Sequence, residues 1–120
     1  MKILVVDDSI TMRRIIVNML KASGCGDIVE AGNGSEALNL MDGVQLVLTD
    51  WNMPVMDGLT FLKEVRANPV YAGIPIIMVT TEGAQKEVIE ALSNGATDYV
   101  VKPFNSITLT KKIAPFLIPG

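Results

Sequence analysis

Val5-Val6-Asp7-Asp8 decides the fold together with a second stretch, Val47-Leu48-Thr49-Asp50-Trp51-Asn52-Met53-Pro54. Each stretch is a short apolar run, long enough for one buried strand, that ends in aspartate. If the two strands lie side by side and parallel, three carboxylates meet at one edge of the sheet. Three like charges at such short range repel one another strongly. A hard divalent cation with oxygen ligands is the simplest remedy, and Mg²⁺ suits such a site.

The remaining segments alternate between strand and helix patterns. Strands are predicted over residues 3–6, 28–31, 46–49, 76–80 and 99–101, and helices over residues 12–20, 35–41, 58–67 and 85–93 and from residue 106 onward. Alternation of this kind, with short connections, is typical of an α/β fold with a parallel sheet and helices on both faces. We therefore predict a doubly wound, five-stranded parallel sheet in one domain over residues 1–120.

Chemically informative residues follow four of the five predicted strands. Asp7 and Asp8 follow the first strand, Asp50 follows the third, Thr80 ends the fourth and Lys102 follows the fifth. In open parallel sheets, ligands bind beyond the carboxyl ends of the strands. A carboxylate can attack phosphorus as a nucleophile, a divalent cation offsets charge on the phosphoryl oxygens, and a lysine adds a compact positive charge. The pattern therefore predicts a phosphoryl-transfer site.

Composition excludes several classes of function. The net charge of -3 argues against a nucleic-acid partner, which would require a basic face. The chain contains no histidine, which excludes a Ser-His-Asp triad and requires any phosphohistidine to come from another protein. Cys25 is the only cysteine, so no disulfide framework exists. No apolar run is long enough to span a membrane, and we expect a cytoplasmic protein without a membrane partner.

Four segments together resemble a response-regulator receiver domain, and most closely the single-domain chemotaxis (CheY-like) members of that family. The similarity runs from residue 3 to about residue 113. The segments that carry it are Asp7-Asp8, Asp50-Trp51-Asn52-Met53-Pro54-Val55-Met56-Asp57-Gly58, Met78-Val79-Thr80-Thr81-Glu82 and Gly95-Ala96-Thr97-Asp98-Tyr99-Val100-Val101-Lys102-Pro103-Phe104. The resemblance implies a flavodoxin-like sheet with strand order 2-1-3-4-5, which the residues alone do not establish.

The resemblance also implies a phosphoacceptor and a set of magnesium ligands. Asp50 would accept the phosphoryl group. Asp8, Asp50 and the backbone carbonyl of Asn52 would bind Mg²⁺ directly, and Asp7 would act through water. On this basis the chain catalyses its own phosphorylation and is not a turnover enzyme.

Further residues acquire roles only through the resemblance. Thr80 and Lys102 would contact the phosphoryl group, and Tyr99 would change rotamer as Thr80 moves toward it. Asn52 and Glu82 lie where the family tunes the lifetime of the phosphoryl group. The surface that switches would consist of the fourth helix, the fifth strand and the last helix.

The implied partners are a CheA-like sensor histidine kinase as phosphodonor, an output protein such as the flagellar motor switch, and a phosphatase. We expect a monomer. Two other receiver functions stay open: a phosphorelay intermediate, and a receiver from a larger regulator. A catalytically silent receiver that only binds proteins is disfavoured, because no acidic, threonine or lysine position of the pattern is missing.

Three local features lead to separate expectations. Pro115 lies inside the apolar stripe of the last helix, so that helix is expected to end near Ala114 or to kink. The Lys102-Pro103 bond is a candidate for the cis isomer, with trans left open. Arg13 and Arg14 are expected on the solvated face of the first helix, opposite an apolar stripe formed by Met12, Ile15, Ile16, Met19 and Leu20.

Overall fold

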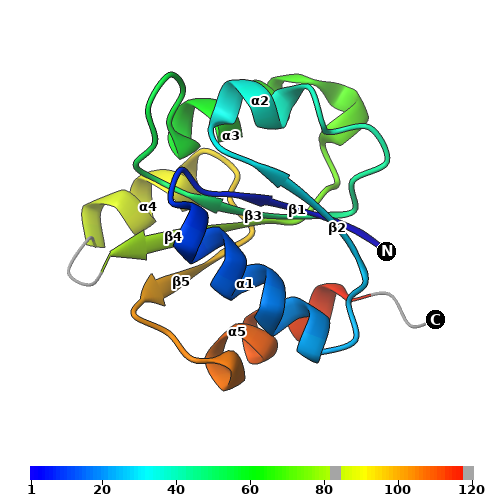
Figure 1. The fold of residues 1–120 in the computed structure, drawn as a ribbon. Coiled ribbons are helices and arrows are strands. Elements are labelled where there is room, and N and C mark those ends of the chain that lie inside the picture. The colour runs from blue at the N-terminus through cyan, green and yellow to red at the C-terminus, as the bar shows by residue number, and fades with distance from the viewer. Residues whose placement is uncertain (82–84, 118–120) are drawn as a thin grey trace.

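Five parallel strands form the middle layer of the computed structural model, which describes residues 1–81 and 85–117 (Figure 1). The strands are β1 (Lys2–Val6), β2 (Asp27–Ala31), β3 (Leu46–Asp50), β4 (Ile76–Thr81) and β5 (Asp98–Lys102). Their order in the sheet is β2-β1-β3-β4-β5, which confirms the predicted topology. The change of direction in strand order falls between β1 and β3, so the ends of these two strands flank the place where such folds bind ligands.

Helices cover both faces of the sheet (Figure 1). They are α1 (Ile10–Ala22), α2 (Gly34–Leu38), α3 (Gly58–Ala67), α4 (Gln85–Ser93) and α5 (Ser106–Ile113), with short 3-10 turns η1 (Pro69–Tyr71) and η2 (Ala114–Phe116). The buried side chains of α1 and α5 pack with one face of the sheet, and those of α2, α3 and α4 pack with the other. The fold is therefore the predicted three-layer α/β sandwich.

Strand burial explains why the apolar runs are continuous. Leu4 and Val6 point into the core beneath α2, α3 and α4, whereas Ile3 and Val5 point into the core above α1 and α5. All four side chains are essentially inaccessible to solvent. A strand covered on both faces has no solvent side on which polar residues are favoured, so its sequence reads as one apolar run.

The helix after β2 ends earlier than predicted, whereas the last helix ends where Pro115 predicted. Asn33 caps α2 by accepting a hydrogen bond from the Glu36 amide at 2.8 Å, but the helix ends at Leu38 and not at the predicted Met41. The helix ends in a tighter turn, in which the Asn39 and Leu40 amides donate to carbonyls three residues earlier. The side chain of Met41 then lies in the core at 1% exposure. The last helix ends at Ile113, and Pro115 lies in the turn η2, where its missing amide hydrogen is not required.

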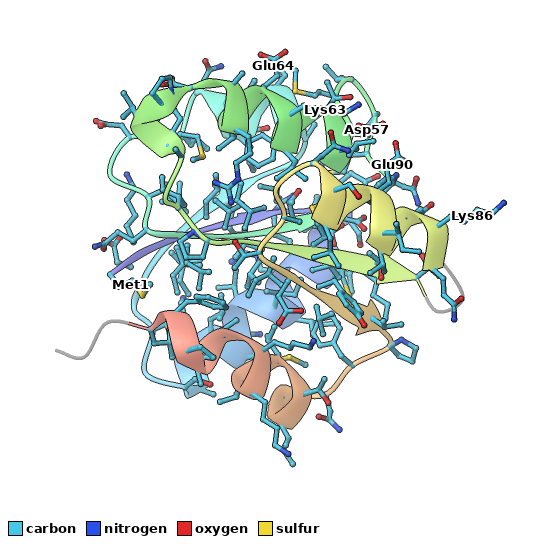
Figure 2. The ribbon with its side chains drawn as sticks, turned by 180° about the vertical axis from the view of Figure 1, so that it is seen from behind. Met1, Asp57, Lys63, Glu64, Lys86 and Glu90 are labelled. Atoms are coloured by element: carbon cyan, nitrogen blue, oxygen red, sulfur yellow. The ribbon has the colours of Figure 1, made fainter. Side chains whose placement is uncertain are left out.

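Charged side chains occupy the outer surfaces of the helices. Figure 2 shows Lys63 and Glu64 on the outer side of α3, and Lys86 and Glu90 on that of α4. Such residues face water, while the apolar faces of the same helices pack on the sheet. Within the described part of the chain, no helix is both long enough and apolar enough to cross a membrane.

Gly58 allows the loop after β3 to fold closely over the end of that strand. Its amide donates a hydrogen bond to the Trp51 carbonyl at 2.8 Å. A Cβ atom at this position would collide with the backbone carbonyl oxygen of Asp50 and would lie 3.0 Å from the Trp51 Cα. Both neighbours are backbone atoms, which cannot move aside independently, so the position requires glycine.

We expect Gly58→Ala to destabilise the protein by about 1–3 kcal/mol, the usual cost of inserting atoms into a packed region. Gly73→Ala is the matched control, because a Cβ there meets no atom within 4 Å. Urea unfolding followed by circular dichroism measures both variants. Equal stability of the two variants would contradict the close approach described above.

Candidate functional site

The parallel register brings the ends of four strands to one edge of the sheet. Val6 lies opposite Thr49, Asp50 lies opposite Val79, and Thr81 lies opposite Lys102. The side chains predicted to act together therefore come from segments that are distant in sequence but adjacent in space. The edge combines acidic groups from β1 and β3 with a hydroxyl from β4 and an ammonium group from β5.

Asp7, Asp8 and Asp50 form an acidic cluster at this edge. One carboxylate oxygen from each residue lies within 4.8 Å of the corresponding oxygens of the other two. Asp7 is buried at 1% exposure, whereas Asp8 faces solvent. The cluster offers only oxygen ligands, which are the ligands preferred by Mg²⁺, and its solvent-facing side leaves room for bound water. Its composition therefore fits a hard divalent cation.

Lys102 provides a positive charge beside the cluster. Its Nζ lies 3.4 Å from Asp50 Oδ1 and 3.5 Å from Asp7 Oδ2. One ammonium group faces three carboxylates, so a formal excess of negative charge remains at the edge. The peptide bond between Lys102 and Pro103 is cis, the isomer that the sequence made a candidate.

The pKa of the Asp50 carboxyl is raised above its ordinary value. Burial is the main cause, and the nearby charge of Asp7 acts in the same direction. Lys102 and the Trp51 amide, which donates to Asp50 Oδ1 at 2.9 Å, oppose the shift but do not cancel it. Folding thus disfavours the ionised Asp50 carboxylate relative to the unfolded chain, chiefly because burial removes this carboxylate from water.

Thr80 carries a hydroxyl group that lacks a partner. Its side chain is 1% exposed, and Oγ1 makes no hydrogen bond to residues 1–81 or 85–117. Buried hydroxyls without partners cost free energy, so they are uncommon in folded proteins. Thr49, a buried threonine on the neighbouring strand β3, donates instead to the Asp50 carbonyl at 3.0 Å. The Thr80 hydroxyl is therefore free to bind a group that enters the site.

The other predicted site residues are more dispersed. Asn52 is exposed in the loop after β3. Tyr99 lies half-buried on β5, opposite Met78, with the Lys112 Nζ 4.6 Å from the centre of its ring. Glu82 lies outside the described residues.

The expectation for Arg13 was wrong. Its side chain is only 18% exposed, and it donates hydrogen bonds to the Asp7 carbonyl at 2.7 Å and to Glu30 Oε1 at 3.1 Å. Arg14, in contrast, is exposed as expected.

The apolar stripe of α1 explains this error. The fully packed residues are Ile16, Val17 and Leu20, whereas Ile15 is 41% exposed. Arg13 precedes these three residues by three, four and seven positions, the spacing of one helix face. That spacing could have shown that Arg13 lies on the buried face of α1. The predicted stripe included Ile15 in place of Val17, which turned the predicted buried face away from Arg13.

Comparisons with known proteins place this arrangement in context. A family model described as the response regulator receiver domain matches residues 3–114. The Chemotaxis protein CheY homolog of Campylobacter jejuni is 51% identical, over 100% of this chain and 95% of that protein. Chemotaxis protein CheY1 of Helicobacter pylori is 51% identical over 94% of each chain. The solved structure of chemotaxis response regulator CheY4 from Vibrio cholerae superposes with a TM-score of 0.88, at 39% identity over 97% of this chain and 98% of that one.

Because the folded protein disfavours ionised Asp50, we expect Asp50→Asn to stabilise the protein at pH 7 in the absence of metal. The gain should be about 0.5–2 kcal/mol, the usual range for removing one unfavourable feature. A raised pKa means that wild-type Asp50 protonates first as the pH falls, so the gain should shrink on acidification through that pKa.

Chemical unfolding in the presence of a chelator, at pH 7 and at two lower pH values, measures this effect. Asp42→Asn, at an exposed position, is the control and should change stability by less than about 0.5 kcal/mol. Destabilisation by Asp50→Asn at pH 7 would be inconsistent with the cost of burying the ionised Asp50 carboxylate.

Proposed function

The chain belongs to the response regulator receiver domain family, and from that membership we propose that it is a phosphoacceptor switch in chemotaxis signalling. Receiver domains are signalling proteins and not turnover enzymes. A CheY-like receiver implies a histidine kinase as phosphodonor and an output partner. We propose a CheA-like kinase, the flagellar motor switch as output, and a phosphatase that restores the resting state.

The single observation that carries the proposal is the convergence of Asp50, its two acidic neighbours and Lys102 at one sheet edge.

Asp50 is the proposed nucleophile. One of its carboxylate oxygens attacks the phosphorus of a phosphohistidine, so that a P–O bond forms and the P–N bond breaks. The imidazole departs and takes up a proton. Since these 120 residues contain no histidine, the donor imidazole lies outside them. Later hydrolysis of the acyl phosphate by water regenerates the Asp50 carboxylate and releases inorganic phosphate.

A divalent cation, proposed as Mg²⁺, would be held by Asp8, Asp50 and the carbonyl of Asn52, with Asp7 acting through water. When bound, it offsets negative charge on the phosphoryl oxygens. Lys102 is proposed to pair with a phosphoryl oxygen on Asp50, and the 3.4 Å between its Nζ and Asp50 Oδ1 supports this role. Asn52 and Glu82 are proposed to tune the lifetime of the product.

The proposed switch begins at Thr80. Its unpaired hydroxyl would donate to a phosphoryl oxygen on Asp50 and thereby lower the free energy of the active conformation. Tyr99 would then change rotamer, and the surface formed by α4, β5 and α5 would change its affinity for the output partner. Both conformations pre-exist in this scheme, and phosphorylation shifts their populations by about 1–3 kcal/mol. We propose that residues 1–120 act as a single monomeric receiver in the cytoplasm.

The fluorescence of Trp51 tests the proposal, because this only tryptophan directly follows Asp50. We expect Mg²⁺ to change its emission, and acetyl phosphate with Mg²⁺ to change it further and to add one phosphoryl group by intact-mass spectrometry. Chelation should prevent the phosphorylation, and Asp50→Asn should abolish it. A folded wild-type protein that responds to neither addition would instead indicate a silent binding module.

Thr80→Val should separate stability from switching. The variant loses a buried hydroxyl that has no partner among residues 1–81 and 85–117, so we expect it to be more stable than wild type by about 1 kcal/mol. It should still be phosphorylated on Asp50 but should lose most of the phosphorylation-dependent change in partner affinity.

Thr49→Val is the matched control for this variant, since its hydroxyl is hydrogen-bonded and its loss should destabilise the protein. Urea unfolding and a binding titration with a peptide of the output partner measure the two properties. A Thr80→Val protein that switches as wild type does would refute the role proposed for this hydroxyl.

A further inference from the structure

We propose that Arg13 is a positioning residue for the acidic site, and that it acts by holding the peptide unit that joins Asp7 to Asp8. The inference rests on the proposed cation-binding function of this site. Arg13 is basic, and its hydrogen bonds go to Glu30 and to the Asp7 backbone carbonyl, not to the carboxylates of Asp7, Asp8 or Asp50. The inference is that it nevertheless promotes cation binding.

Arg13 folds back from the second turn of α1 onto the end of β1. The helix begins after Ser9, whose Oγ accepts the Met12 amide at 3.1 Å, and the Arg13 amide bonds to the Ser9 carbonyl at 2.9 Å. The guanidinium group then returns past this turn and donates from Nη1 to the Asp7 carbonyl at 2.7 Å. The side chain thus spans the turn that carries the two aspartates.

The Asp7 carbonyl determines where Asp8 begins. This carbonyl and the Asp8 amide belong to one planar peptide unit, so fixing the oxygen also limits rotation of the plane and the position of the Asp8 Cα. Other bonds already fix Asp7: its amide donates to the Ala31 carbonyl at 3.1 Å, and its Oδ1 accepts the Ser9 amide at 2.9 Å. Arg13 adds the constraint on the side of Asp8, the exposed and otherwise least restrained member of the cluster.

Glu30 holds the guanidinium group in place. It lies on β2 and accepts a hydrogen bond from Arg13 Nε at 3.1 Å, so the side chain is fixed at two points of its planar donor group. Both partners are largely shielded from water, at 18% and 28% exposure of the side chains. A planar group held at two points positions a neighbour better than a flexible point charge does.

Charge alone predicts the opposite effect on cation binding. Arg13 is positive and lies close to the acidic edge, so its removal would strengthen Mg²⁺ binding if electrostatic repulsion were its only influence. Positioning predicts weaker binding on removal, because Asp8 then samples orientations that do not bind the ion. The sign of the change therefore distinguishes the two effects.

Arg14 supplies a matched control. It has the same charge, adjoins Arg13 in the chain, and approaches the same Glu30 at 3.9 Å, but its side chain is 66% exposed. Arg14→Met removes one positive charge from the same helix turn. Arg13→Met removes that charge together with the bond to the Asp7 carbonyl.

The test is a titration of the full chain with MgCl₂, read by Trp51 fluorescence and by isothermal titration calorimetry. Thermal unfolding in chelator is recorded for each variant, and titrations are run well below the lowest midpoint. We expect Arg13→Met to weaken Mg²⁺ binding by about tenfold or more, the usual loss when a group that orients a metal ligand is removed. Arg14→Met should change the Mg²⁺ affinity by less than about twofold.

Mg²⁺ affinity that is unchanged or higher in Arg13→Met would overturn the inference, even if that variant is less stable. Arg13→Lys covers the case in which Arg13→Met does not fold: lysine keeps the charge but lacks the planar donor group, so weaker binding supports positioning and unchanged binding overturns it. If wild type itself binds no Mg²⁺, the proposed function fails together with this inference. Wild-type binding with equal affinity in every variant rejects the inference alone.

Discussion

Repulsion among three carboxylates at one sheet edge is the constraint on which the rest of the structure depends. Asp7 directly follows β1 and Asp50 ends β3, and the core aligns these strands, so these two carboxylates cannot move far apart, whereas Asp8 faces solvent beside them. Lys102 offsets part of this repulsion from β5. Burial adds a further cost at Asp50: it is the main cause of the raised pKa of that carboxyl, and the attraction of Lys102 lowers this pKa only in part. The apolar interior therefore supplies the stability that keeps an unfavourable arrangement of charges in place.

The same edge contains a second unfavourable feature of a different kind. Thr80 buries a hydroxyl without a partner in the described structure, beside carboxylates that lack sufficient positive charge. Either feature could be removed by a simple substitution, yet both occur at the site whose proposed ligands would satisfy them. Unpaired polar groups and close like charges concentrate at functional sites. A ligand that satisfies them binds more tightly, because its binding removes a free-energy cost that the unliganded protein carries.

Sequence reasoning recovered the fold and the composition of the acidic edge because both depend on strong, local patterns. Apolar runs that end in aspartate indicate strands, and a parallel sheet brings their ends together once the strand order is known, which the family resemblance implied. Arg13 was missed because its role depends on where its guanidinium group folds, and a small rotation of the assumed helix stripe placed it in water. The unpaired state of Thr80 was equally unpredictable, since a threonine at a strand end does not reveal whether a partner is within reach. The structure shows which side chains lie close together at the site, and the roles given to them in phosphoryl transfer and switching stay predictions.

The order of the strands along the chain also affects how the protein emerges during synthesis. All three carboxylates lie within the first half of the sequence, whereas the lysine that faces them is the last residue of the final strand, β5. A nascent chain on the ribosome consequently exposes the acidic residues long before their counter-charge has been made. The folded sheet has β5 at one side, and Lys102 at its end offsets part of this charge. Incompletely synthesised chains would thus lack Lys102 beside the acidic cluster.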